Sequence, residues 1–256
     1  MYTTKVSVIT VVFNAKNTIA QTIESVLSQT YKNIEHIVID GGSTDGTLSI
    51  IQKYRDKIAK FISKPDQGIY DAMNKGILLA SGKVVGFLNA DDMFYDKNVI
   101  QRVALSFDNN DIDCIYGNLV YVSCKNIDRI TRCWESKEFC DGLFQKSWTP
   151  AHPTFYCKKN IYERFGLYRT DFKIAADVEL MYRFLQKNHV RSKYINADFV
   201  RMRDSGVSNH GIKSTVVITR EMKRAIIENG GQFNLIKYLF FKFLKISEFS
   251  RAYGKR

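Results

Sequence analysis

Short, almost wholly apolar runs alternate with amphipathic stretches over residues 6–88 of this 256-residue chain. The runs are rich in β-branched residues and too short for stable helices, so residues 6–13, 34–39, 61–63 and 84–88 are predicted to be strands. Strands that alternate with helices indicate parallel βαβ units. The sequence therefore predicts an α/β fold built on a Rossmann-like, mostly parallel sheet flanked by helices.

The predicted helices lie between these strands. Thr18 and Gln21 resemble a capping box, and apolar residues then recur at helical spacing as far as Leu27. Residues 48–57 and 71–80 give the second and third helices. Beyond residue 112 the alternation loosens, with strands predicted near 115–122 and 154–157 and helices near 159–165 and 178–187. We interpret this second half as a lid or acceptor-side region built onto the first.

The tail from Asn234 onward has a different pattern, that of a basic amphipathic helix. On a helical wheel its apolar residues share one broad face: Leu235, Ile236, Leu239, Phe240, Phe243 and Ile246. Lys237, Lys242 and Lys245 lie outside that face. The pattern is typical of a peripheral membrane anchor, and the alternative is a helix that packs on the rest of the protein.

Composition narrows the possible settings. The five cysteines lack any C-x-x-C spacing, which argues against a disulfide-bonded module or a zinc site and favours a reducing, cytosolic compartment. We expect neither a signal peptide nor a membrane-spanning helix. The net charge of +12 favours polyanionic partners, and the absence of the common nucleic-acid motifs makes nucleic acid the least favoured of them.

Two adjacent carboxylates, Asp91 and Asp92, follow the strand at residues 84–88. The carboxyl ends of strands in an open α/β sheet form its ligand crevice. Two like charges side by side are commonly neutralised by Mg²⁺ or Mn²⁺, which needs only one or two carboxylates and keeps positions open for substrate phosphates. The alternative is an ordinary acidic turn.

The second predicted strand also ends in a carboxylate, Asp40, followed by Gly41 and a polar loop to Thr47. Such a carboxylate can accept hydrogen bonds from a base or a ribose, and glycines let a backbone approach a ligand closely. The loop matches neither the dinucleotide-binding G-x-G-x-x-G pattern nor a Walker A loop. An ordinary strand-to-helix turn is the alternative.

Taken together, these motifs resemble those of the family 2 inverting glycosyltransferases of the GT-A fold, in the variant found in bacterial polysaccharide assembly. The matching segments, in order, are VSVITVVFN (6–14), SVLSQTY (25–31), DGGSTDGT (40–47), DQGIYDAMNKG (66–76), NADD (89–92) and AD (176–177). The resemblance covers roughly residues 5–210. It implies a glycosyltransferase domain over residues 1–212, with a nucleotide-binding half at about 1–111 and an acceptor-side half at about 112–212, and a helical extension over 213–256.

The resemblance implies a hexosyl- or N-acetylhexosaminyltransferase that takes its sugar from a nucleotide donor, with a UDP-sugar favoured. It places Asn14, Asp40, Gly41, Gly68, Asp71, Asn89 and Asp91 at the donor. Asp91 and Asp92 correspond to the family's D-x-D motif, with Asp91 favoured as the ligand of Mg²⁺ or Mn²⁺ and His210 as a further ligand. Gly68 and Asp71 have an alternative role as a turn and a helix start, and His210 as an ordinary surface histidine.

Asp177 resembles the family's general base, which must reach the acceptor hydroxyl on the face of the sugar away from the leaving diphosphate. Its alternative role is a carboxylate at a helix start. His152 is predicted to face the acceptor, with a structural histidine as the alternative. The resemblance implies a glycan acceptor, which we expect to be lipid-linked. The basic tail predicts that the enzyme lies on the inner face of the cytoplasmic membrane.

The chain departs from the family pattern at three places. Asn89 replaces the usual first Asp of D-x-D, Asp40-Gly41 replaces a usual Asp-Asp, and Met73 replaces an Arg in the middle motif. These departures put the nucleotide contacts and the identity of the donor's nucleobase in question. Two other classes stay open: a noncatalytic protein that binds nucleotide sugars or glycans, and a nucleotidyltransferase, which would release pyrophosphate.

Overall fold

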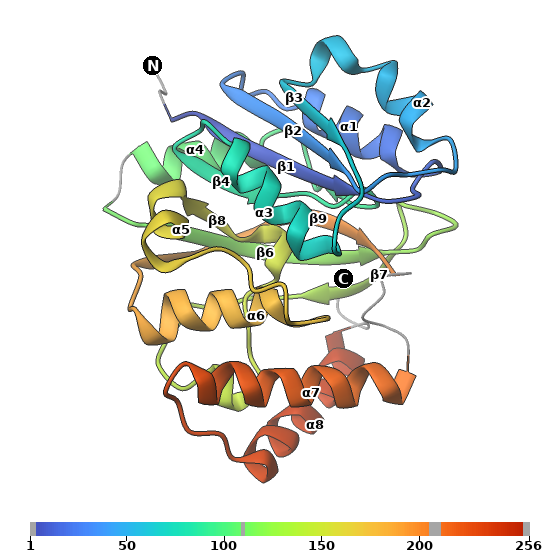
Figure 1. Cartoon of the computed structure of the whole chain (residues 1–256). Helices are drawn as coiled ribbons and strands as arrows, with labels where there is room; N and C mark the ends of the chain where they lie inside the picture. The colour runs from blue at the N-terminus through green and yellow to red at the C-terminus, as the bar shows by residue number, and fades with distance from the viewer. Residues whose placement is uncertain (1–3, 109–110, 205–210, 253–256) are drawn as a thin grey trace.

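A computed structural model describes residues 4–108, 111–204 and 211–252. One sheet runs through the described chain in the order β3-β2-β1-β4-β8-β6-β9-β5, with β7 paired to β6 (Figure 1). The strands are β1 (Val6–Val12), β2 (Ile34–Asp40), β3 (Lys60–Ser63), β4 (Val84–Phe87), β5 (Met93–Phe94), β6 (Cys114–Val122), β7 (Ile130–Trp134), β8 (Tyr156–Lys158) and β9 (Ser192–Arg203).

The α-helices are α1 (Ile19–Leu27), α2 (Thr47–Gln52), α3 (Ile69–Leu79), α4 (Val99–Asp108), α5 (Lys159–Phe165), α6 (Ala176–Met181), α7 (Gly211–Glu228) and α8 (Leu235–Ala252). A π-helical turn, Tyr182–Lys187, continues α6. Short 3₁₀ turns lie at Arg55–Lys57, Phe144–Lys146 and His152–Thr154.

Alternating side chains of the central strand hold the two helical layers to the sheet. Ile9 and Val11 of β1 lie in one buried cluster with Met73 of α3, whereas Val6 and Val8 lie in another with side chains of α1 and α4. This alternation follows from the two-residue period of a strand. Because both faces are covered, β1 is apolar along almost its whole length, as expected for a parallel strand.

The first half of the fold confirms the predicted βαβ pattern. Strands β3, β2, β1 and β4 are parallel neighbours, and α1, α2 and α3 connect them. The predicted capping box is wrong: Thr18 precedes α1, but its side chain makes no capping hydrogen bond. The Thr18 hydroxyl donates instead to the Ala15 carbonyl at 3.4 Å, and the Gln21 side chain accepts a hydrogen bond from the distant Arg203.

The second half of the chain extends the same sheet. β8 pairs antiparallel with β4, and β9 pairs parallel with β6 and antiparallel with β5, so the sheet crosses the predicted boundary near residue 112. The elements α4, β5, β7 and β9 were not predicted. α7 and α8 form the orange-to-red layer of Figure 1, where α7 packs against α6 on the side away from the sheet.

Candidate functional site

Three predicted site segments follow the carboxyl ends of neighbouring parallel strands. β1 pairs with β2 on one side and with β4 on the other. Asn14 follows β1, Asp40 ends β2, and the Asn89–Asp92 turn follows β4. Parallel pairing therefore brings these segments to one edge of the sheet, where open α/β folds bind ligands.

Asp40 is buried and shapes the loop that follows it. Its Oδ2 accepts hydrogen bonds from the backbone N–H groups of Gly42 and Ser43, both at 3.0 Å, and from Ser63 Oγ at 2.7 Å. Its Oδ1 is buried and has no hydrogen-bond partner among the described residues. One oxygen thus holds the loop, while the other is left for a further donor.

Asn14 fixes the same loop from the end of β1. Its backbone lies in the left-handed region, with φ of 49°. The side-chain Oδ1 accepts a hydrogen bond from the Thr44 N–H at 2.9 Å, and the Asn14 N–H donates to Ser43 Oγ at 2.8 Å. These contacts support the loop, and a direct donor contact from Asn14 stays a prediction.

Gly41 allows a second carboxylate, Asp66, to come close to the loop. A Cβ atom at Gly41 would lie 2.4 Å from Asp66 Oδ2, so any other residue would displace that carboxylate. Asp66 Oδ1 accepts a hydrogen bond from the N–H of Gly68 at 2.9 Å. Gly68 has φ of +116°, which favours glycine, and it immediately precedes α3.

Asp71 lies in the first turn of α3, and its contacts are local. Its Oδ2 accepts a hydrogen bond from the Gln67 N–H at 3.0 Å and lies 2.9 Å from Lys75 Nζ. The hydrogen bond from Lys75 lowers the pKa of Asp71. These contacts match the helix-start alternative, and its role at the donor stays a prediction.

The two carboxylates of the Asn89–Asp92 turn differ in their exposure to solvent. Asp91 is partly exposed, whereas the Asp92 side chain is only 1% exposed. Asn89 Nδ2 donates to Asp92 Oδ2 at 3.4 Å, and Thr22 Oγ1 donates to the Asp92 carbonyl at 2.8 Å. The expectation that both carboxylates lie in an open crevice is therefore wrong for Asp92, because its backbone is drawn against α1 and its side chain into the core.

Burial controls the electrostatics of this pair. Burial raises the pKa of Asp91, and burial together with the charge of Asp91 raises the pKa of Asp92 well above its usual range. In both cases the charge of Arg203 works in the opposite direction. The buried Oδ1 atoms of Asn89 and Asp92 have no hydrogen-bond partner among the described residues. A hard divalent cation fits such an oxygen-rich turn.

The described part of the chain contains no larger cluster of metal-binding side chains that would be an alternative metal site. Within residues 4–108, 111–204 and 211–252, no group of three or more His, Cys, Asp or Glu side chains is arranged to hold a metal ion. Mg²⁺ is usually bound by one or two carboxylates together with substrate phosphates, so a smaller set suffices. His210, the predicted further ligand, lies outside the described residues.

Arg203 is a site residue that the sequence interpretation missed. It ends β9 and is 5% exposed, and its guanidinium donates hydrogen bonds to the Asp91 carbonyl and to Gln21 Oε1. With Gln21 it lines a cavity of about 550 Å³ beside the loop at 124–127. The sequence offered one signal that could have found it. Two arginines, Arg201 and Arg203, alternate with apolar residues at the end of a short apolar segment.

Asp177 lies in the first turn of α6, close to two other predicted segments. Its Oδ1 lies 3.5 Å from the hydroxyl of Tyr70, which is in the first turn of α3. Burial raises the pKa of the Asp177 carboxyl, and the nearby His152 works against that rise. A buried carboxyl whose pKa is raised by its surroundings is a candidate for proton transfer.

His152 is buried beside Asp177. Its Nε2 lies 2.7 Å from the Tyr168 hydroxyl, and its ring stacks on Phe87 with 5.6 Å between centroids. Burial lowers the pKa of His152, and the Asp177 charge opposes that shift. These contacts match the structural alternative, and contact with the acceptor stays a prediction.

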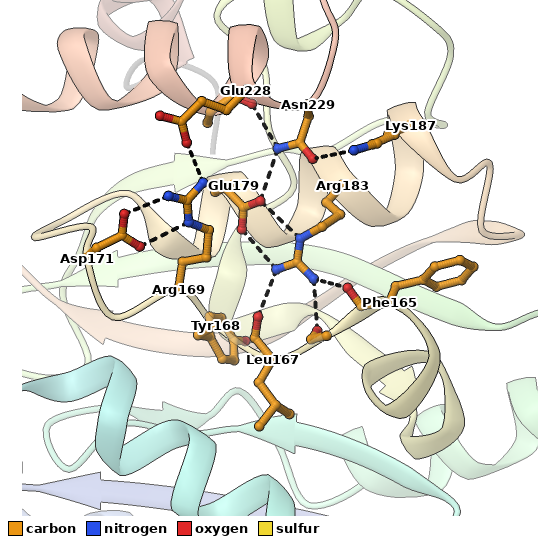
Figure 2. Close-up of polar contacts among 12 residues, drawn as sticks. Phe165, Leu167, Tyr168, Arg169, Asp171, Glu179, Arg183, Lys187, Glu228 and Asn229 are labelled. Atoms are coloured by element: carbon orange, nitrogen blue, oxygen red, sulfur yellow. Dashed lines mark hydrogen bonds and ion pairs between the residues drawn. The ribbon is translucent and has the colours of Figure 1, made fainter.

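A buried ion pair supports the segment that carries Asp177 and Tyr168 (Figure 2). The Arg183 guanidinium bonds both carboxylate oxygens of Glu179, at 3.0 and 2.9 Å, and the Leu167 carbonyl at 2.8 Å. Asn74 of α3 holds the next residue through two hydrogen bonds to the Tyr168 backbone, at 2.8 and 2.9 Å. The loop at 165–171 is thereby fixed between α3 and α6.

Comparison with known proteins identifies the family that this chain resembles. Residues 7–171 match Glycosyl transferase family 2. An uncharacterized glycosyltransferase of Mycobacterium tuberculosis is 35% identical over 186 residues, which are 70% of this chain and 68% of the relative. The PGL/p-HBAD biosynthesis glycosyltransferase of Mycobacterium bovis is 25% identical over 85% of this chain and 82% of its own length.

Solved structures show the same fold at lower sequence identity. S. aureus TarS 1–349 in complex with UDP-GlcNAc has a TM-score of 0.68 and 18% identity, over 93% of this chain and 72% of that chain. The mannosyltransferase PcManGT from Pyrobaculum calidifontis, in complex with GDP-Man and Mn²⁺, has a TM-score of 0.66 and 16% identity, over 94% and 69%. The GT-A fold prediction is therefore confirmed.

Proposed function

Because this chain belongs to glycosyltransferase family 2, we propose that it is a metal-dependent inverting enzyme that transfers a sugar from a nucleotide donor to a hydroxyl of a glycan. The observation that carries the proposal is the sheet edge itself. Oδ1 of Asp40 and of Asp92 is buried there without a partner among the described residues, beside the partly exposed Asp91. Buried oxygens without partners are costly unless a ligand completes them.

A UDP-sugar is the donor we favour. The segments at Asn14, Asp40, Gly41, Gly68, Asp71, Asn89 and Asp91 are those that the family resemblance assigns to donor binding. TarS, which has this fold, was solved with UDP-GlcNAc, and PcManGT was solved with GDP-Man. Both complexes support a nucleotide sugar, and the TarS complex supports uridine.

Asp91 and Asp92 are the residues that would hold Mg²⁺ or Mn²⁺. Asp91 is the accessible carboxylate, so we assign it the direct contact. When bound, such an ion neutralises the charge on the departing diphosphate as a Lewis acid. The PcManGT complex, which contains Mn²⁺, supports this assignment.

We assign the general-base role to Asp177. The acceptor hydroxyl oxygen forms a bond to the anomeric carbon while the bond from that carbon to the diphosphate oxygen breaks. The electron pair of the broken bond leaves with the nucleoside diphosphate, and the Asp177 carboxylate takes the hydroxyl proton. Attack from the face opposite the leaving group inverts the anomeric carbon.

We further propose that α8 places the enzyme on an anionic membrane surface, where a lipid-linked acceptor for polysaccharide assembly would be found. The structure turns Tyr238 of α8 inward, and Ile236 and Phe243 are 83% and 70% exposed. Other large apolar side chains of the helix are exposed as well: Leu235, Leu239, Phe240 and Leu244. The described side chains of the predicted apolar face are therefore exposed, which supports the membrane proposal over the packing alternative; the Ile246 side chain lies outside the described residues.

Lys242 is the exception to the predicted basic surface. Its Nζ lies 3.4 Å from Thr219 Oγ1 and 5.9 Å from the centre of the Tyr238 ring, and burial lowers its pKa. Lys242 thus packs against α7, and Lys237, which is exposed, is the described lysine of α8 that is available to lipid headgroups. None of the described helices is both long enough and apolar enough to cross a bilayer.

Vesicle co-sedimentation tests the membrane proposal. Replacing Ile236 and Phe243 by Ser should remove salt-sensitive binding to vesicles containing phosphatidylserine, because each basic contact adds only about 1 kcal/mol and the apolar side chains supply the rest. Lys242→Gln is the matched control, since it changes a lysine that packs inward. Retained binding by the Ser variant would contradict the proposal.

The test of the enzymatic proposal starts with the donor. A thermal-shift screen of UDP- and GDP-sugars with Mn²⁺ identifies the preferred one, because a bound donor raises apparent stability. Release of the nucleoside diphosphate from that donor is then measured with octyl glycosides as acceptors, and NMR of the product should show an inverted anomeric carbon. Donor binding without turnover would indicate a noncatalytic binding protein, and pyrophosphate release would indicate a nucleotidyltransferase.

A further inference from the structure

The carboxylate of Glu221, in the middle of α7, reaches the backbone that leads into α6. Its Oε1 accepts a hydrogen bond from the Lys173 N–H at 2.8 Å. Its Oε2 accepts from the N–H groups of Ile174 at 3.0 Å and Ala175 at 2.9 Å. Glu221 is buried, so these bonds are shielded from water.

These three N–H groups belong to the residues directly before α6, of which Asp177 is the second residue. Buried backbone N–H groups that precede a helix have no acceptor within it and need one from elsewhere. Lys173 and Ile174 lie outside α6, and Ala175 is its N-cap residue. Glu221, from a distant helix, supplies the acceptors for all three N–H groups.

The same short segment is held from its other side by α3. The Tyr70 hydroxyl donates a hydrogen bond to the Ile174 carbonyl and lies 3.5 Å from Asp177 Oδ1. The backbone at residue 174 is therefore fixed through its N–H by α7 and through its C=O by α3. Such opposed contacts restrict both the position and the rotation of the entry to α6.

A second contact fixes α7 itself along α6. Asn229 Nδ2, just beyond α7, donates to Glu179 Oε1 at 3.0 Å, and Glu179 is the carboxylate that pairs with Arg183 (Figure 2). Glu228 pairs with Arg169 and Arg224 on the exposed side of the same helix. α7 is thereby anchored at its far end by contacts that do not involve the segment at 173–175.

We propose that Glu221 is a positioning residue for the reaction: by accepting three hydrogen bonds from the segment at 173–175, it sets where α6 begins and so where the Asp177 carboxylate lies. The inference rests on the proposed function, in which Asp177 is the base. In this proposal α7, which lies outside the residues that match the family, contributes to the geometry of the site.

Glu221→Gln tests this with a side chain of the same shape. One acceptor oxygen becomes an NH₂ group that faces a backbone N–H, so the segment must shift. Because a displacement of about 1 Å at a reacting group can cost about 100-fold in rate, we expect kcat for transfer to fall at least about tenfold, with the KM for the donor unchanged. Lys223→Gln, at an exposed position of the same helix, should keep the wild-type kcat.

The pH profile of kcat separates positioning from a loss of stability. Asp177 faces Tyr70 and His152, and burial is the main cause of its raised pKa. A shifted segment admits water, so the acid limb of the profile should move to lower pH in Glu221→Gln. A variant that is folded, as shown by circular dichroism, and that has wild-type kcat and an unchanged acid limb would overturn the proposal.

Glu221→Asp keeps the charge and shortens the side chain, and it serves as the second variant. Failure of both variants to fold would make Glu221 a general stability residue and would also overturn the proposal. Asp177→Asn is measured in parallel. If Asp177→Asn transfers at the wild-type rate, the base assignment itself fails, whereas loss in Asp177→Asn with full activity in Glu221→Gln removes only the positioning role.

Discussion

Strand β2 carries two buried carboxylates, Glu35 near its amino end and Asp40 at its carboxyl end, and their hydrogen bonding differs. Glu35, near the amino end, accepts hydrogen bonds from Ser7 Oγ at 2.6 Å and from the N–H and Oγ of Ser81, both at 2.7 Å. Lys60 Nζ lies 3.2 Å from it. Although burial acts to raise the pKa of Glu35, these hydrogen bonds lower it to about 2.

The carboxyl end of the sheet leaves its buried oxygens incomplete. Oδ1 of Asp40 and Oδ1 of Asp92 have no partner among the described residues, and the pKa of Asp92 is raised by burial and by the charge of Asp91. The carboxylate near the amino end of β2 is therefore satisfied by the protein itself, whereas the carboxylates at the carboxyl end of the sheet each keep an oxygen without a described partner. The difference supports a structural role for Glu35 and the proposed ligand role for Asp40 and Asp92.

The largest effect is expected at Asp177, on the ligand side. Asp177→Asn should keep donor binding and lower transfer by roughly 10²- to 10⁴-fold, because general-base assistance is lost. Steady-state transfer and donor titration on the same preparation measure this. Transfer at the normal rate would leave Asp177 as a helix-start residue and nothing more.

The next effect is expected at the satisfied end. Glu35→Gln should lower the free energy of unfolding by about 2–3 kcal/mol, because a buried, charge-assisted set of hydrogen bonds is broken, while the donor affinity is unchanged. Urea denaturation measures the first quantity and calorimetry the second. Loss of donor affinity without loss of stability would reverse the comparison.

The pH dependence of the same variant gives an independent check. Glu35 has a pKa of about 2 in the folded protein and about 4.3 when unfolded, so its ionised form stabilises the fold above about pH 4.3. That contribution is lost as the pH falls from about 4.3 toward 2. Glu35→Gln should therefore lose less stability than the wild type over this interval.

The smallest effect is expected at Asp92 in the metal-free protein. Its folded pKa lies above the unfolded value, so ionisation near neutral pH opposes folding. Asp92→Asn in EDTA should raise the free energy of unfolding, and with it Tm, at pH 7.5. The gain should disappear below about pH 4, where unfolded Asp is protonated too. Thermal melts at both pH values test it, and a destabilised variant at pH 7.5 would contradict it.

Much of the fold could be predicted because its signals are local. The β-branched runs of β1, β2 and β4 are buried on both faces, so their composition alone indicates parallel strands. β9 was missed because polar residues such as Asn196 and Asp198 interrupt its apolar pattern, and its place is set by pairing with the distant β6.

The site residues taken from the motifs, Asp40, Asp91 and Asp177, stay predictions. The motifs gave no indication that Asp92 is buried, because adjacent residues in a turn carry no signal for which one points inward. Arg203 contacts Asp91 from 112 positions away, and Glu221 contacts Ala175 from 46 positions away. Contacts of that separation depend on the assembled fold and leave no local pattern.

Isothermal titration of the preferred UDP-sugar, with Mn²⁺ and with EDTA, tests the central claim that the carboxyl end of the sheet is a metal-dependent donor site. The account predicts that wild type and Glu35→Gln bind the donor alike and only with Mn²⁺. It also predicts that Asp91→Asn weakens the affinity by at least about tenfold, since even groups that only support a metal ligand are worth that much. Wild-type affinity in Asp91→Asn, or equal affinity in EDTA, would contradict it.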